Sequence, residues 1–105
     1  MPALETLYYR TKDDEEEYIF EFVTLPDGSE RAYIKHHPSY QGRDQSHYHT
    51  HLCPFGGPRY ISWENKVSSR NEMKCIATLW ADQTQEYIKT GKALTLESEY
   101  YRRGE

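Results

Sequence analysis

The stretch SRNEMKCIATLWADQTQEYIKTG, residues 69–91, decides the fold of this 105-residue chain. Within it, one stripe of residues recurs at spacings of three and four, which is the period of an amphipathic helix. The stripe consists of Met73, Ile76, Ala77, Trp80, Thr84, Tyr87 and Ile88. At the start, Ser69 and Glu72 have the spacing of a capping box, and at the end Gly91 suits a left-handed C-cap. The sequence therefore predicts a helix over residues 70–90 that packs its stripe against a sheet.

The residues before this helix have the composition of short strands joined by turns. Three segments are rich in β-branched and aromatic residues, as strands are: LETLYYR (4–10), YIFEFVT (18–24) and RAYIKH (31–36). Two further segments, HYHTHLC (47–53) and RYISW (59–63), complete the set. We predict the α+β class, with an antiparallel meander of four to five strands and one long C-terminal helix packed on one face.

The chain divides near the end of the helix. We predict a single α+β domain over residues 1–91 and a C-terminal tail over residues 92–105. The tail begins with the alternating piece ALTL and continues as ESEYYRRGE. This pattern leaves three alternatives open, which are an edge strand, a short helix or a flexible end.

Composition narrows the class of protein. The net charge is −4 and the pI about 5.7, which argues against a nucleic-acid partner, since such proteins present a basic face. No apolar run is long enough to cross a membrane, and the N-terminus lacks the pattern of a signal peptide. The two cysteines, Cys53 and Cys75, are too few for a disulfide scaffold. We expect reduced thiols, with Cys75 buried at the edge of the helix stripe, in a cytoplasmic protein.

All five histidines lie between residues 36 and 51. In a strand, His47, His49 and His51 would share one face with Cys53, because successive side chains alternate. Two imidazoles at that spacing can bind one zinc ion together with a third ligand from His36, His37 or Cys53. The candidates for a metal site are His47, His49, His51 and Cys53. The simpler interpretation is a solvent-exposed strand face without a cofactor.

The same segment also resembles a known motif. HYHTHLC, preceded by Gln45 and Ser46, resembles the signature of the histidine-triad nucleotide hydrolases and transferases. In that family the middle histidine attacks a phosphate. The resemblance implies that His49 would be the nucleophile, with His47 and His51 as its supports.

Tyrosine is the most overrepresented residue, with ten copies. Tyrosine and arginine are enriched at protein interfaces, and four such residues, Tyr100, Tyr101, Arg102 and Arg103, follow one another in the tail. The acidic run Asp13–Glu17 could steer a basic partner. The chain contains no complete catalytic constellation. We therefore predict a non-enzymatic protein-binding or regulatory module that binds another protein or itself through this tail.

Overall fold

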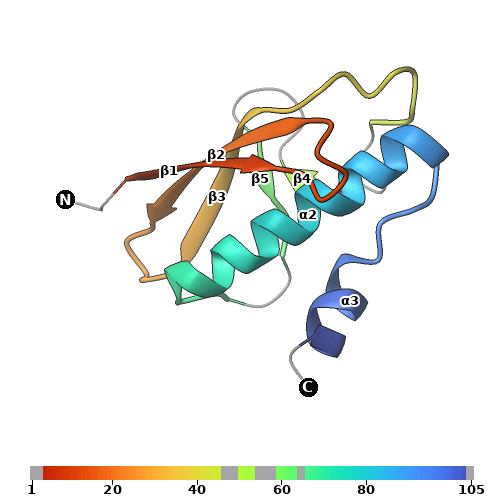
Figure 1. The fold of residues 1–105 in the computed structure, drawn as a ribbon. Helices are drawn as coiled ribbons and strands as arrows, with labels where there is room; N and C mark the ends of the chain where they lie inside the picture. The colour runs from red at the N-terminus through yellow and green to blue at the C-terminus, as the bar shows by residue number, and fades with distance from the viewer. Residues whose placement is uncertain (1–3, 46–49, 54–58, 64–65, 104–105) are drawn as a thin grey trace.

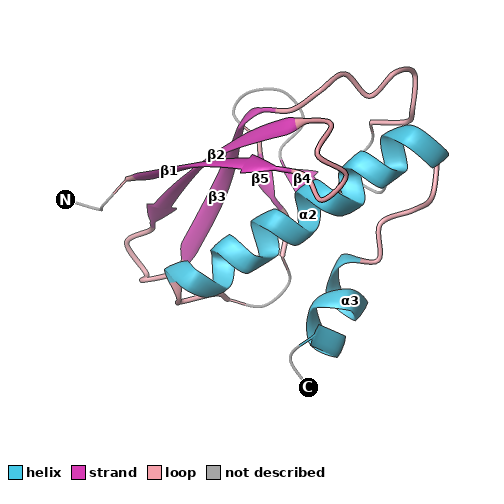
Figure 2. Cartoon of the chain, in the orientation of Figure 1, coloured by secondary structure: helices cyan, strands magenta, loops and turns pink. Residues whose placement is uncertain are grey.

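The structure is a computed structural model that describes residues 4–45, 50–53, 59–63 and 66–103. A five-stranded antiparallel sheet lies against a long helix, with a short helix at the C-terminal end (Figures 1 and 2). The strands are β1 (Glu5–Arg10), β2 (Glu17–Thr24), β3 (Glu30–His36), β4 (Leu52–Cys53) and β5 (Tyr60–Ile61), and the helices are α2 (Arg70–Thr90) and α3 (Leu96–Arg103). The predicted fold class is confirmed.

The sheet has the strand order β1-β2-β3-β5-β4. The first three strands follow one another as hairpins, while β5 pairs with β3 and places β4 at the far edge. A bulge between Ile19 and Phe20 shifts the register of β2 against β3. Strand β1 forms the other edge and pairs with β2 from Glu5↔Phe22 to Arg10↔Glu17.

Helix α2 has the bounds that its sequence pattern predicts. The Ser69 hydroxyl accepts a hydrogen bond from the Glu72 backbone N–H at 3.2 Å. At the other end Gly91 adopts a φ of 79°, and its N–H donates to the Tyr87 carbonyl at 2.8 Å. A residue with a Cβ would be strained at that angle, so glycine ends the helix here. Neither this helix nor any other described one is long and apolar enough to span a membrane.

The core lies between α2 and the inner face of the sheet. Tyr18, Phe20 and Phe22 alternate along β2, and all three side chains are fully buried. The Trp80 ring from the middle of α2 meets Tyr18 and Phe20 edge-on, with centroid distances of 5.7 and 6.0 Å. Its indole N–H donates to the Thr50 carbonyl at 2.9 Å, so its one polar atom is satisfied inside the core.

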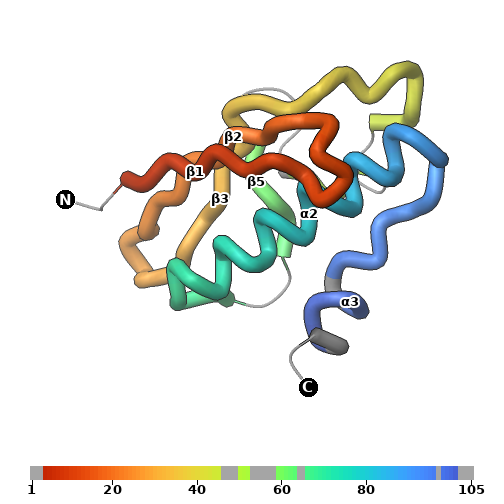
Figure 3. The backbone as a smooth tube through the Cα atoms, in the orientation of Figure 1, coloured from red at the N-terminus to blue at the C-terminus, as the bar shows by residue number. Residues whose placement is uncertain are grey.

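Of the three alternatives for the C-terminal tail, the short helix is the one found, because a loop after α2 leads into α3 over Leu96–Arg103 (Figure 3). Leu94 and Leu96 belong to the buried core, and Tyr100 packs against it. Leu96 and Tyr100 stand four residues apart, so one side of a helix carries both. A helix also satisfies its own backbone groups, which a strand outside the sheet would not.

Cys75 is exposed, which corrects the expectation that its thiol is buried. Its neighbours Met73 and Ile76 are buried on the same helix. Successive residues of an α-helix point in different directions around its axis. Cys75 lies just outside the buried stripe, so its side chain points toward solvent.

Candidate protein-binding surface

Among its described residues, 50–53, the histidine segment departs from the predicted strand at Thr50 and His51. Only Leu52 and Cys53 are extended, as β4, whereas Thr50 has helical geometry and His51 has a left-handed φ of 57°. A positive φ breaks the alternation of side chains, so His51 does not continue the face of β4. Both neighbours of His51 are anchored in the core, since Thr50 and Leu52 are buried. His47 and His49 lie outside the described residues.

The described part of the chain offers no metal site. Among those residues, no three His, Cys, Asp or Glu side chains are grouped so that they could hold a metal ion. His37, one candidate for a third ligand, places its Nδ1 2.7 Å from the Pro38 carbonyl and its ring against Tyr40. The zinc site and the histidine-triad site therefore remain predictions. The expectation that the three histidines of the histidine segment share one strand face is wrong at His51, which lies outside β4.

Helix α3 brings two of the four predicted partner-binding residues into a surface cluster. The rings of Tyr100 and Tyr101 lie 5.4 Å apart, and each also contacts Trp63, at 5.3 and 6.4 Å. We call Trp63, Tyr100 and Tyr101 the α3 aromatic cluster. Arg102 and Arg103 continue α3, but their side chains are not among those described.

The two tyrosines of this cluster have different environments. The Tyr100 hydroxyl donates to the Glu72 carboxylate at 2.7 Å, which ties α3 to the first turn of α2. Desolvation and the adjacent Glu72 charge raise the pKa of Tyr100 to about 12. Tyr101 is one of three large hydrophobic residues that the described chain leaves exposed, with 49% of its surface accessible. Tyr100 therefore fixes the cluster in place, and Tyr101 presents a ring to solvent.

Trp63 belongs to this cluster, although the sequence reading assigned it only to the end of a strand. It follows β5 directly and is partly buried against the core. Trp63 lies in the loop after β5, where the packing of a strand does not require an aromatic side chain. A large aromatic residue in such a loop is the signal that could have identified it. Its contact with Tyr100 spans 37 positions of sequence, so no local pattern contains it.

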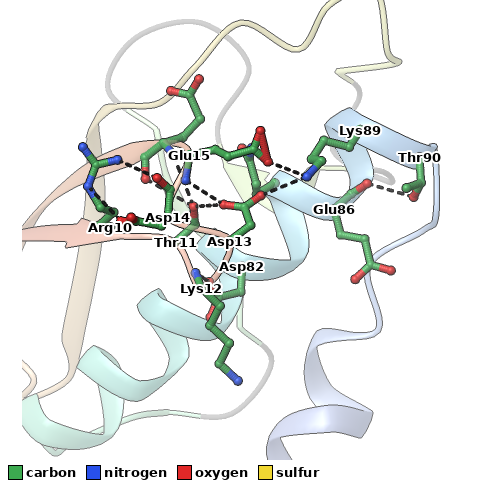
Figure 4. A network of polar contacts seen from close by, with 12 residues as sticks. Arg10, Thr11, Lys12, Asp13, Asp14, Glu15, Asp82, Glu86, Lys89 and Thr90 are labelled. Carbon is green, nitrogen blue, oxygen red and sulfur yellow. Dashed lines mark hydrogen bonds and ion pairs between the residues drawn. The ribbon is translucent and has the colours of Figure 1, made fainter.

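Side chains of the acidic run, Asp13–Glu17, form hydrogen bonds and ion pairs within the chain (Figure 4). Asp13 accepts hydrogen bonds from Thr11 and from the Glu15 backbone N–H, and Lys89 of α2 reaches both Asp13 and Glu15. Burial raises the pKa of the Asp13 carboxyl, but these hydrogen bonds outweigh it and hold the pKa at about 2. The run therefore attaches the β1–β2 loop to the C-terminal turn of α2, and this leaves less of its charge for steering a partner.

A second group of aromatic residues lies on the face of the sheet opposite α2. Tyr33 and Tyr60 are direct partners on β3 and β5, with ring centroids 5.8 Å apart. The Arg31 guanidinium lies 3.9 Å from the Tyr60 centroid and donates to the Tyr33 hydroxyl at 3.2 Å. The Arg31 cation and the two tyrosine rings already interact with one another, so we do not place the binding site here.

Comparison with known proteins adds no family to this description. No protein-family model matches the chain, and no curated protein or solved structure matches it. Functional inference rests on the chemistry of the surfaces described above.

Proposed function

We propose that this protein is a non-enzymatic protein-binding module whose contact centre is the α3 aromatic cluster. The observation that carries the proposal is the exposed Tyr101 ring held against two other aromatic rings. Tryptophan, tyrosine and arginine are enriched at the hot spots of protein interfaces, and the two aromatic residues bury large areas at low cost in conformational entropy. The cluster combines two of these residue types on one rigid surface.

The rigidity of the cluster supports binding rather than a purely structural role. Tyr100 is anchored by its hydrogen bond to Glu72, and Leu96 is buried on the same helix. The rings are therefore already ordered before a partner arrives, which lowers the entropic cost of association. The Tyr101 ring stays half exposed beside the two anchored rings, so it is available to a partner.

The chemistry of the cluster defines the partner. The exposed Tyr101 ring fits an apolar pocket that encloses an aromatic side chain. Arg102 and Arg103 follow in the sequence, but Glu97, Glu99 and Glu105 lie in the same stretch, so this end of the chain carries no net positive charge. We propose a protein partner with an apolar pocket, so burial of the Tyr101 ring, rather than charge, should dominate the affinity.

Photo-crosslinking in host cells tests this proposal. A photoreactive phenylalanine analogue at position 101 should form a covalent adduct with one defined protein. The same analogue at position 92, which is also exposed, is the matched control and should form no such adduct. Trp63→Ala should abolish the adduct at 101 because it removes the ring that supports Tyr101. Identical adducts from positions 101 and 92 would refute the proposal.

A further inference from the structure

Strand β1 is an open edge of the sheet. Among the described strands it pairs only with β2, so its other side presents backbone N–H and C=O groups without a strand partner. Such an edge is a template for pairing with another strand. Two of the three exposed large hydrophobic residues lie here, Leu4 and Tyr8, each 65% accessible. Both features point to a second strand that the described part of the chain does not supply.

The side chains of β1 alternate between two environments. Glu5 pairs with Lys74, and the Tyr9 hydroxyl donates to Asp82 at 2.8 Å, so the odd-numbered residues face α2. Thr6, Tyr8 and Arg10 are exposed on the open face, and Leu4 is exposed just before them. The exposed apolar residues therefore stand four positions apart on one side of the strand.

We propose that β1 pairs with β1 of a second copy of this chain, antiparallel and centred on Thr6. The two-fold axis that joins two antiparallel edges into one sheet is perpendicular to the sheet, so each residue faces a residue of the same side. Centred on Thr6, the register places Leu4 opposite Tyr8 of the partner subunit, and places Tyr8 opposite Leu4 of the partner subunit. Both exposed apolar side chains are then covered.

Other registers are less favourable. Centred on Leu7, the pairing would place Leu4 opposite the charged Arg10 of the partner subunit. Centred on Tyr8, it would place Leu4 opposite the charged Lys12 of the partner subunit, beyond the end of β1. Aromatic–aliphatic cross-strand pairs stabilise a sheet, and the Thr6 register forms two of them. This self-complementarity is the reason to identify the occupant as a second copy.

The small area that two paired β1 strands bury limits the affinity of the dimer. Strand β1 has six residues, and stable interfaces bury about 1,200 Å² or more, which a single pair of short strands does not reach. The dimer should therefore be weak and form at micromolar to millimolar concentration.

Cysteine crosslinking tests the register directly. In a background with both native cysteines replaced, Cys53→Ser and Cys75→Ser, Thr6→Cys places two thiols on the two-fold axis, where opposite Cα atoms are about 4.5–5.5 Å apart and a disulfide fits. Arg10→Cys is the matched control on the same strand and face, with its two copies about 26 Å apart in this register. With oxidised glutathione, Thr6→Cys should form covalent dimer at least tenfold faster than Arg10→Cys. Equal rates would overturn the register.

Sedimentation of the unmodified chain tests the association itself. Wild-type protein should approach twice the chain mass of 12.5 kDa as concentration rises. Tyr8→Lys should remain monomeric, whereas Tyr101→Lys, which changes the other exposed tyrosine, should associate like wild type. A wild-type monomer at every concentration would overturn the proposal, as would loss of the dimer in Tyr101→Lys alone.

Discussion

Two groups of aromatic rings in this protein share one contact geometry and differ in their exposure. Trp80 meets Tyr18 at 5.7 Å with an interplanar angle of 89°, and Trp63 meets Tyr100 at 5.3 Å and 85°. Trp80 and Tyr18 are fully buried, whereas the ring next to Tyr100, that of Tyr101, is 49% exposed. The same pairwise contact therefore serves a core in one place and a surface in the other.

The polar partners of the rings explain the difference. The Trp80 indole donates to a backbone carbonyl 30 residues away, which fixes the loop at Thr50 to α2. The Tyr100 hydroxyl donates to the carboxylate of Glu72, at the solvent-facing start of the same helix. The first bond closes the interior, and the second orients a ring at the surface. The two groups differ in how far their rings are buried, and only the exposed ring of Tyr101 is available to a partner.

The largest effect should come from the buried group. Trp80→Ala removes the centre of the core and leaves the Thr50 carbonyl without its donor. It should lower the free energy of unfolding by about 3–5 kcal/mol, which unfolds many domains of this size. Urea denaturation measures the loss, with Trp63→Ala as the control that loses less than half as much. A loss below about 1 kcal/mol would show that α2 does not depend on this ring.

Leu96 links the two groups and should give the next largest effect. Its side chain is 1% exposed and anchors α3, so Leu96→Ala should cost about 2–4 kcal/mol. Ala93, exposed in the loop before α3, is the control, and Ala93→Ser should change stability by less than about 0.5 kcal/mol. Equal effects at the two positions would mean that the tail makes no contribution to the fold.

Tyr100→Phe isolates the hydrogen bond at the surface. Its loss should cost about 1 kcal/mol near neutral pH. Because the folded pKa of Tyr100 is raised to about 12 from an ordinary value near 10, this contribution is complete below pH 10 and disappears as the pH rises toward 12. Denaturation curves between pH 9 and 12 should therefore converge for wild type and Tyr100→Phe. A difference that persists above pH 12 would contradict the role of the hydroxyl.

The elements that sequence predicted well are those encoded by neighbouring residues. The bounds of α2 follow from its period and from Ser69 and Gly91, which satisfy the helix ends locally. The buried face of β2 follows from the alternation of Tyr18, Phe20 and Phe22. These signals need no knowledge of distant residues, because the backbone geometry of one element fixes them.

The elements that sequence missed depend on contacts through space. The left-handed φ of His51 is rare for a residue with a Cβ, and the core positions of Thr50 and Leu52 hold it there. The tail combines a two-residue spacing, Leu94 to Leu96, with a four-residue spacing, Leu96 to Tyr100, so neither period dominates. The contact between Trp63 and Tyr100 joins two segments that no local pattern connects.

The smallest effect on stability, and the most direct test of the binding proposal, belongs to Tyr101→Ala. Its free energy of unfolding should match wild type within about 0.5 kcal/mol, because the ring is half exposed and Tyr100 and Leu96 still hold α3. Affinity for the protein captured at position 101 should fall at least tenfold, as expected of an interface hot spot. Unchanged affinity in a fully folded Tyr101→Ala protein would contradict the assignment of this cluster as the binding site.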